Sequence, residues 1–162
     1  MMSPDRKIVL GLGNLLNKDE GLGVQAVKLL DAQLGPQDGV ELLDGGVLGL
    51  SLLTMVEECS HLLILDAVDA NRPEGSVIEL ARDQIPLYTG IKLSQHQITF
   101  QEVLGLAKMR GNLPVNLHLI GIQPKDLSIG LDLSPEITQA LPEVLRRAAA
   151  VLQDWKLINL TG

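Results

Sequence analysis

Cysteine and aromatic residues are scarce in this chain. Cys59 is the only cysteine among 162 residues, so neither an internal disulfide nor a zinc cluster of several thiolates can form within one chain. The only aromatic residues are Tyr88, Phe100 and Trp155, and the 46% hydrophobic content therefore comes almost entirely from Leu, Ile, Val and Ala. An aliphatic core of this kind suits a β-sheet covered by helices.

Basic clusters and long apolar runs are also absent from the sequence. Thirteen Lys and Arg stand against 20 Asp and Glu, which gives a formal net charge of -7 at pH 7. This charge repels nucleic acids and anionic membranes. No segment reaches the roughly 18 apolar residues of a membrane span, and residues 1–6 are too polar for a secretory signal. We therefore expect a cytoplasmic protein that binds neither nucleic acid nor membrane.

The order of the apolar segments predicts one α/β domain over residues 1–162. Short aliphatic runs suited to strands alternate with segments of helical periodicity. The predicted strands cover residues 7–12, 40–43, 61–65, 76–80 and 115–122, and the predicted helices begin near residues 22, 50, 99 and 135. This alternation favours a mainly parallel twisted sheet of about five strands with helices on both faces. Residues 76–80 are expected at the sheet edge, in a hairpin-like excursion.

The common nucleotide-binding and hydrolase motifs are missing. Gly11-Leu12-Gly13 resembles the start of a dinucleotide fingerprint, but the position of the third glycine is occupied by Leu16. The chain has no GxxxxGK[ST] loop, no GxSxG elbow and no HExxH pair. Dinucleotide binding, nucleotide hydrolysis, α/β-hydrolase chemistry and thermolysin-like proteolysis therefore lose their usual support.

Acidic side chains and one histidine follow the predicted strands. The candidates are Asp19 and Glu20 after the first strand, Asp44 ending the second, Asp66 ending the third, and His96 in the loop before a helix. The carboxyl ends of parallel strands feed loops that converge on one crevice. Two carboxylates and a neutral imidazole there would suit a divalent transition metal such as zinc or nickel. Each acid also has an ordinary alternative role, at a helix start or in a turn.

Five blocks of the sequence resemble the hydrogenase maturation proteases. The segment Gly11–Val24 (GLGNLLNKDEGLGV) is similar to the family's opening signature, in which GxGN follows the first strand and D-E/D-x-x-G enters the first helix. The other blocks follow in the family's order: Asp44-Gly45-Gly46, Leu65-Asp66-Ala67-Val68, Ser94-Gln95-His96-Gln97 and Gly121-Ile122-Gln123-Pro124. Together the blocks span nearly the whole chain.

The resemblance implies an endopeptidase that removes the C-terminal extension from the precursor of the nickel-iron hydrogenase large subunit after nickel insertion. In that family the second acid of the first block, the aspartate ending the third strand and the loop histidine bind metal. Carried over, these residues are Glu20, Asp66 and His96. The implied metal is nickel carried by the substrate, or another divalent transition metal such as zinc. Asp44 is a candidate catalytic residue that orients the strand-end loops or acts on water.

Two alternatives from other functional classes remain open at this point. A metal-dependent binding or chaperone module without peptidase activity would keep the three ligands and leave a nickel-loaded precursor uncut. A structural or degenerate α/β domain would have no metal affinity at all.

Overall fold

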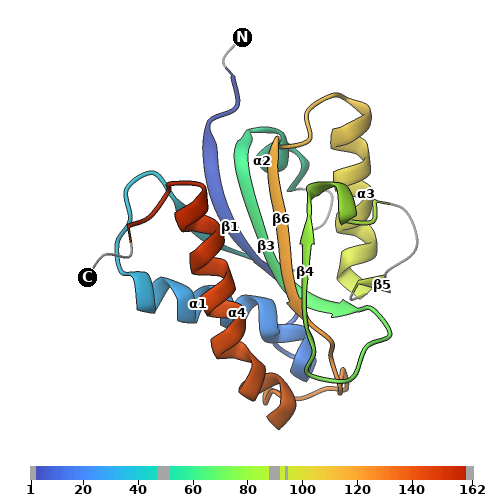
Figure 1. Ribbon diagram of the computed structural model, residues 1–162. Coiled ribbons are helices and arrows are strands. Elements are labelled where there is room, and N and C mark those ends of the chain that lie inside the picture. The colour runs from blue at the N-terminus through green and yellow to red at the C-terminus, as the bar shows by residue number, and fades with distance from the viewer. Residues whose placement is uncertain (1–2, 47–51, 88–91, 94, 160–162) are drawn as a thin grey trace.

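A five-stranded sheet forms the centre of the protein, and the computed structural model describes residues 3–46, 52–87, 92–93 and 95–159 (Figure 1). The strands are β1 (Arg6–Leu12), β2 (Glu41–Gly46), β3 (Cys59–Asp69), β4 (Val77–Ala81), β5 (Lys92–Leu93) and β6 (Asn116–Ile122). In the main sheet the order is β2-β1-β3-β6-β4, and β5 pairs separately with the end of β3. All neighbours in the main sheet are parallel except β4, which is antiparallel to β6. The predicted mainly parallel sheet of about five strands is confirmed.

Helices cover both faces of this sheet. They are η1 (Lys18–Gly21), α1 (Leu22–Leu34), α2 (Leu53–Glu57), η3 (Arg82–Gln84), α3 (Gln95–Met109) and α4 (Pro135–Asp154). One core layer packs α1 and α4 against Val9, Leu63 and Leu65, whereas the other packs α2 and α3 against residues that alternate with these along the strands, such as Leu62 and Ile64. This period of two is the expected signature of strands buried on both faces. None of the helices in the described ranges is long and apolar enough to cross a membrane.

The bounds of β3 and α3 differ from the prediction. Strand β3 continues beyond residue 65 because Ala67 still pairs with Ile122 of β6 and Val68 pairs with Leu93 of β5. Helix α3 begins at Gln95 rather than near residue 99, so the backbone of His96 belongs to the first helical turn and not to the preceding loop. The predicted start of α2 at residue 50 falls outside the described residues.

Strand β4 corrects the predicted hairpin-like excursion. It lies at the sheet edge, as expected, but its partner is β6, which follows it by more than thirty residues, and not the preceding strand β3. The sequence between β4 and β6 contains β5 and α3, which cross over one face of the sheet. The alternating pattern of residues 76–80 marks an edge strand without identifying its partner.

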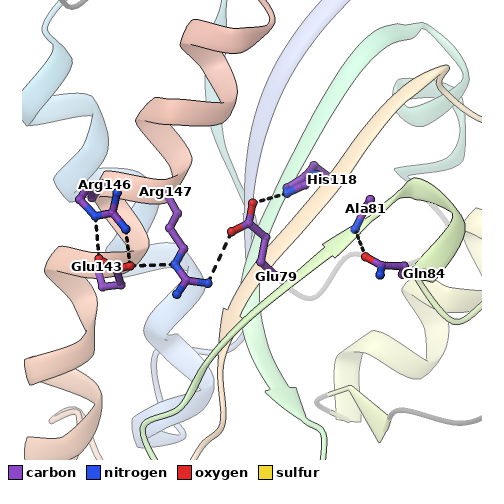
Figure 2. Close-up of polar contacts among 7 residues, drawn as sticks. All are labelled: Glu79, Ala81, Gln84, His118, Glu143, Arg146 and Arg147. Atoms are coloured by element: carbon purple, nitrogen blue, oxygen red, sulfur yellow. Dashed lines mark hydrogen bonds and ion pairs between the residues drawn. The ribbon is translucent and has the colours of Figure 1, made fainter.

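An ion-pair network fastens α4 to the antiparallel edge of the sheet (Figure 2). The ring Nε2 of His118 lies 2.7 Å from Oε2 of Glu79, whose other oxygen lies 3.5 Å from Arg147 of α4. Within α4, Glu143 binds both Arg147 at 2.9 Å and Arg146 at 2.6 Å. His118 therefore has a structural partner within the sheet, in the middle of β6.

The carboxyl ends of β1, β3 and β6 lie at a single edge of the sheet, drawn at the bottom of Figure 1. The first turns of α1, α3 and α4 lie at this edge as well (Figure 1). The topology therefore brings the chain segments that follow three neighbouring strands to one place, which is where a parallel α/β sheet binds its ligands.

Candidate functional site

Asp66 is a fully buried carboxyl group at the carboxyl edge of the sheet. Neither of its oxygens accepts a hydrogen bond of normal geometry from the described part of the chain. Burial raises the pKa of Asp66 well above its ordinary value, the nearby backbone N–H of Ala67 partly offsets this, and the charge of Glu20 raises the pKa further. A buried polar group without partners is costly, so this one requires a proton or a cation to satisfy it.

The position of Asp66 within β3 explains why its buried carboxyl group faces the loops at the sheet edge. The preceding residue, Leu65, is the last in β3 to pair with β1, whereas Asp66 itself still pairs with Gly121 of β6. Beyond Leu12 the chain leaves β1, and the loop that follows it comes to lie beside Asp66 instead of a strand. The carboxyl group therefore meets loop residues of the edge.

The backbone of Glu20 lies close to the carboxyl group of Asp66 because two glycines allow unusually close packing. Gly13 has a φ of +122°, and a Cβ there would overlap the backbone oxygen of Glu20 while lying 3.6 Å from Oδ1 of Asp66. A Cβ on Gly23, in the first turn of α1, would overlap the backbone oxygens of Leu12 and Leu65. Only glycine fits at both positions. The glycines of the opening signature thus bring the largely buried Glu20 near the carboxyl group of Asp66.

Asp19, the neighbour of Glu20, is a structural anchor rather than a free ligand. Its buried carboxylate accepts four hydrogen bonds: Oδ2 from the amides of Lys125 and Asp126 and from the Ser134 hydroxyl, and Oδ1 from the Ser134 amide, at 2.7–2.9 Å. These donors lie after β6 and at the start of α4. Asp19 does not cap α1, since the residue before α1 is Gly21 and no side chain caps the helix; it lies with Glu20 in the first turn of η1. Asp19 instead fixes the position of Glu20.

Asp44 stands apart from these two carboxylates. It pairs with Gly11 on one side of β1, while Leu65 pairs with Gly11 on the other side. The backbones of Asp44 and Leu65 are thus two strand spacings apart, roughly 10 Å. The side chain of Asp44 is exposed near the same edge. Any direct action of Asp44 would therefore be on a substrate lying across β1.

His96 is placed by its backbone alone, since its side chain lies outside the described residues. Helix α3 starts two residues after Leu93, which pairs with Val68 of β3. The alternation along β3 turns Asp66 toward the same face as Leu62 and Ile64, the face that α3 covers. The first turn of α3 and the carboxyl group of Asp66 therefore share one edge and one face of the sheet.

The carboxylate oxygens of the described site are donor atoms suited to a divalent cation. Asp66 offers two buried oxygens without partners, and the negative charge of Glu20 lies near enough to raise the pKa of this group. Such a pair is stabilised by a cation and opposed by mutual repulsion in its absence. Among the side chains that the structure describes, however, no three His, Cys, Asp or Glu residues are grouped to hold a metal ion. The metal-binding set of Glu20, Asp66 and His96 thus stays a prediction.

The raised pKa of Asp66 leads to a prediction on stability in chelator-treated, metal-free protein. A folded-state pKa above the unfolded value means that the folded chain holds the proton more tightly, so its stability is fully present below pH 3.8 and declines as the pH rises toward the folded pKa. The decline is up to about 1.4 kcal/mol per pH unit. Asp66→Asn removes this pH dependence. In urea titrations, the free energy of unfolding of the variant relative to that of wild type should therefore increase as the pH rises from 4 to 7.

The exposed, uncharged Gln33 provides the control for this measurement. Gln33→Ala removes no titratable group, so it should keep a constant difference from wild type across the same pH range. A constant difference for Asp66→Asn as well would contradict a raised pKa for Asp66.

Comparisons with known proteins give the family of the chain. The family described as HycI, hydrogenase maturation protease, matches residues 24–151. The hydrogenase expression/formation protein HupD of Thiocapsa roseopersicina is 39% identical over 160 residues, which cover 98% of this chain and 72% of HupD. The hydrogenase 2 maturation protease of Escherichia coli K12 is 33% identical over 150 residues, 92% of each chain. The solved structure of the hydrogenase-maturating endopeptidase HybD of E. coli covers 92% of this chain at 33% identity, with a TM-score of 0.83. With its fold and nearly its full length matched, the chain belongs to the hydrogenase maturation proteases and is an endopeptidase of that family.

Proposed function

We propose that this endopeptidase removes the C-terminal extension from the precursor of the nickel-iron hydrogenase large subunit, and that it does so after nickel has been inserted. Membership of the hydrogenase maturation proteases supports the class of substrate. The observation that carries the nickel requirement is the buried carboxyl group of Asp66, whose two oxygens lack partners while Glu20 lies close by. A cation delivered by the substrate would complete this group.

The proposed role of the three residues is to sense nickel as cargo of the substrate. Glu20, Asp66 and His96 form a ligand set without a nucleophile motif beside it, and the described members are two carboxylates. A protein distinguishes two forms of a substrate only through a difference in binding free energy between them. Nickel on the precursor would supply that difference by gaining ligands from these residues. A resident divalent metal such as zinc is the alternative use of the same set.

The bond-breaking step needs a water molecule and a group that takes its proton. Water attacks the carbonyl carbon of the scissile peptide bond, the C–N bond breaks, and the leaving amine receives a proton. Asp44 is our candidate for the group that acts on this water or orients the loops around it, because it is exposed near the edge that holds Asp66. We further propose a cytoplasmic location, which is supported by the reduced state expected of the buried, lone Cys59.

The test is an incubation of the purified protein with nickel-loaded precursor, followed by intact mass spectrometry of the precursor. A single mass loss equal to a C-terminal peptide is the expected result. A precursor that is bound but never cut would instead favour the metal-dependent binding or chaperone module. A precursor that is cut at several internal positions would contradict a processing protease.

A further inference from the structure

Four large aliphatic side chains project into solvent from two loops next to Glu20. The exposed fractions are 61% for Leu16, 40% for Leu127, 87% for Ile129 and 69% for Leu131. Leu16 lies in the loop between β1 and η1, and the other three lie in the segment between β6 and α4. We call these four residues the apolar loop patch. Exposed aliphatic residues grouped in this way mark an interaction site more often than scattered single ones do.

The two loops are fastened to each other by hydrogen bonds along their length. The amide of Lys18 donates a hydrogen bond to the backbone oxygen of Gly130 at 3.0 Å. The amide of Gly130 in turn donates to the backbone oxygen of Leu16 at 2.9 Å. The side chain of Asn17 donates to the backbone oxygen of Leu127 at 3.1 Å. These bonds hold the backbone on which the patch is built. A partner that binds there would meet a surface already ordered, which lowers the entropic cost of binding.

Two ion pairs neutralise four of the charged side chains around the patch, whereas the exposed Asp132 next to Leu131 adds a negative charge. Lys18 pairs with Asp126 at 3.0 Å, and Lys125 pairs with Glu136 at 2.7 Å. Beside Leu131 lies a hollow of about 380 Å³ whose lining is largely polar: besides Leu131, it consists of Lys18, Lys125, Asp126, Gly130, Asp132, Leu133, Ser134 and Pro135. Exposed aliphatic side chains next to such a hollow suit an apolar segment of a protein partner that has polar groups beside it.

The patch is continuous with the candidate site. Leu16 precedes Glu20 by four residues in one loop, and the other loop supplies the amides of Lys125 and Asp126 that hold Asp19. A protein substrate that brings an atom to Glu20 and Asp66 must therefore pass beside these loops. Other exposed large hydrophobic residues, Met109 and Val115, lie at the end of α3 and just before β6, at the opposite edge of the sheet.

We propose that the apolar loop patch is the docking surface for the large-subunit precursor, which it binds through an apolar segment next to the C-terminal extension. The proposal rests on the proposed function, because it takes the precursor as the occupant. Docking on the patch would hold the precursor while its metal centre is presented to Glu20 and Asp66. Part of the binding free energy for the precursor would then not depend on nickel.

The test compares two double substitutions by their affinity for nickel-free precursor. Ile129→Ser with Leu131→Ser removes the two most exposed side chains of the patch, and Met109→Ser with Val115→Ser is the matched control at the opposite edge. We expect the Kd of the patch variant to rise at least about tenfold, as for aliphatic anchors of an interface, and that of the control to stay within about twofold of wild type. The KM for nickel-loaded precursor should rise in parallel in the patch variant.

Three results would overturn the docking proposal. They are an unchanged Kd in the patch variant, an equal loss in the control variant, and a wild-type dimer in sedimentation that the patch variant converts to monomer. The third result would show that a second copy of the chain covers the patch. A wild-type protein that binds precursor tenfold better than the patch variant but never cuts the nickel-loaded form would overturn the proposed function alone.

Discussion

Glu20→Gln and Asp66→Asn should each lower the rate of precursor cleavage by roughly a hundredfold or more while the protein stays folded. Each substitution replaces a carboxylate by an amide of nearly the same volume. Loss of a residue that only supports a metal ligand already costs about 10- to 100-fold, so loss of a ligand should cost at least as much. Binding of the cation also requires Asp66 to release the proton that burial favours, which the amide cannot mimic. Single-turnover cleavage followed by intact mass would measure the rates.

Controls for these variants come from elsewhere in the chain. Asp38→Asn changes an exposed acid in the same way, and Cys59→Ser changes a buried residue whose thiol has a pKa raised by burial to about 12. Both should cleave at the wild-type rate. The cleavage rate of His96→Ala should fall as it does in the two carboxylate variants. His118→Ala should lose only the contact with Glu79 and keep its cleavage rate. Loss of cleavage in a folded His118→Ala or Cys59→Ser protein would show that the site lies elsewhere.

Nickel-loaded precursor should be cut about a hundredfold faster than nickel-free precursor at equal concentration. Without a cation, burial raises the pKa of the Asp66 carboxyl group and opposes its charged form, so the site offers little to the substrate. With nickel, the same residues become ligands, and a binding difference of this order lies within the usual range for coupling between two partners. Intact mass spectrometry of both precursor forms, sampled over time, gives the ratio directly.

Inhibitor and metal controls separate this explanation from its rivals. Inhibitors of serine and cysteine proteases should have no effect, because the sequence has no GxSxG elbow and Cys59 is buried with a raised pKa. Zinc added to nickel-free precursor should not restore cleavage if the substrate carries the metal. Equal cleavage of the nickel-free precursor, or of its isolated tail peptide, would refute nickel sensing.

Local signals explain the parts of the fold that the sequence predicted well. Helix α1 ends at Leu34, as expected, because Gly35 adopts a φ of +67° that terminates the helix. The start of α4 follows from Ser134 and Pro135, a pair typical of a first helical turn. The wholly apolar run before Asp66 correctly predicted a buried strand there, although β3 does not end at Asp66 but continues to Asp69. Each of these predictions depends on residues within a few positions of one another.

Long-range partners explain what the sequence could not show. The hydrogen-bond donors to Asp19 lie 106 to 115 residues further along the chain, so its anchoring role has no local signature. The pairing of β4 with β6 depends on the insertion of β6 between β3 and β4, although β6 follows both in the sequence. The complete burial of Asp66 depends on β3, β6 and the loop after β1 together. The apolar loop patch likewise joins two loops that are distant in sequence.

The distance along the chain between Asp19 and its donors has a consequence for synthesis on the ribosome. A nascent chain grows by roughly 5 to 20 residues per second, and its N-terminal part emerges first. β1, η1 and α1 are therefore made several seconds before Ser134, which supplies two of the four hydrogen bonds to Asp19. Until then the buried Asp19 lacks these two hydrogen bonds, which hold the turn that carries Glu20. The anchor of the candidate site can therefore be completed only when the last quarter of the chain is made.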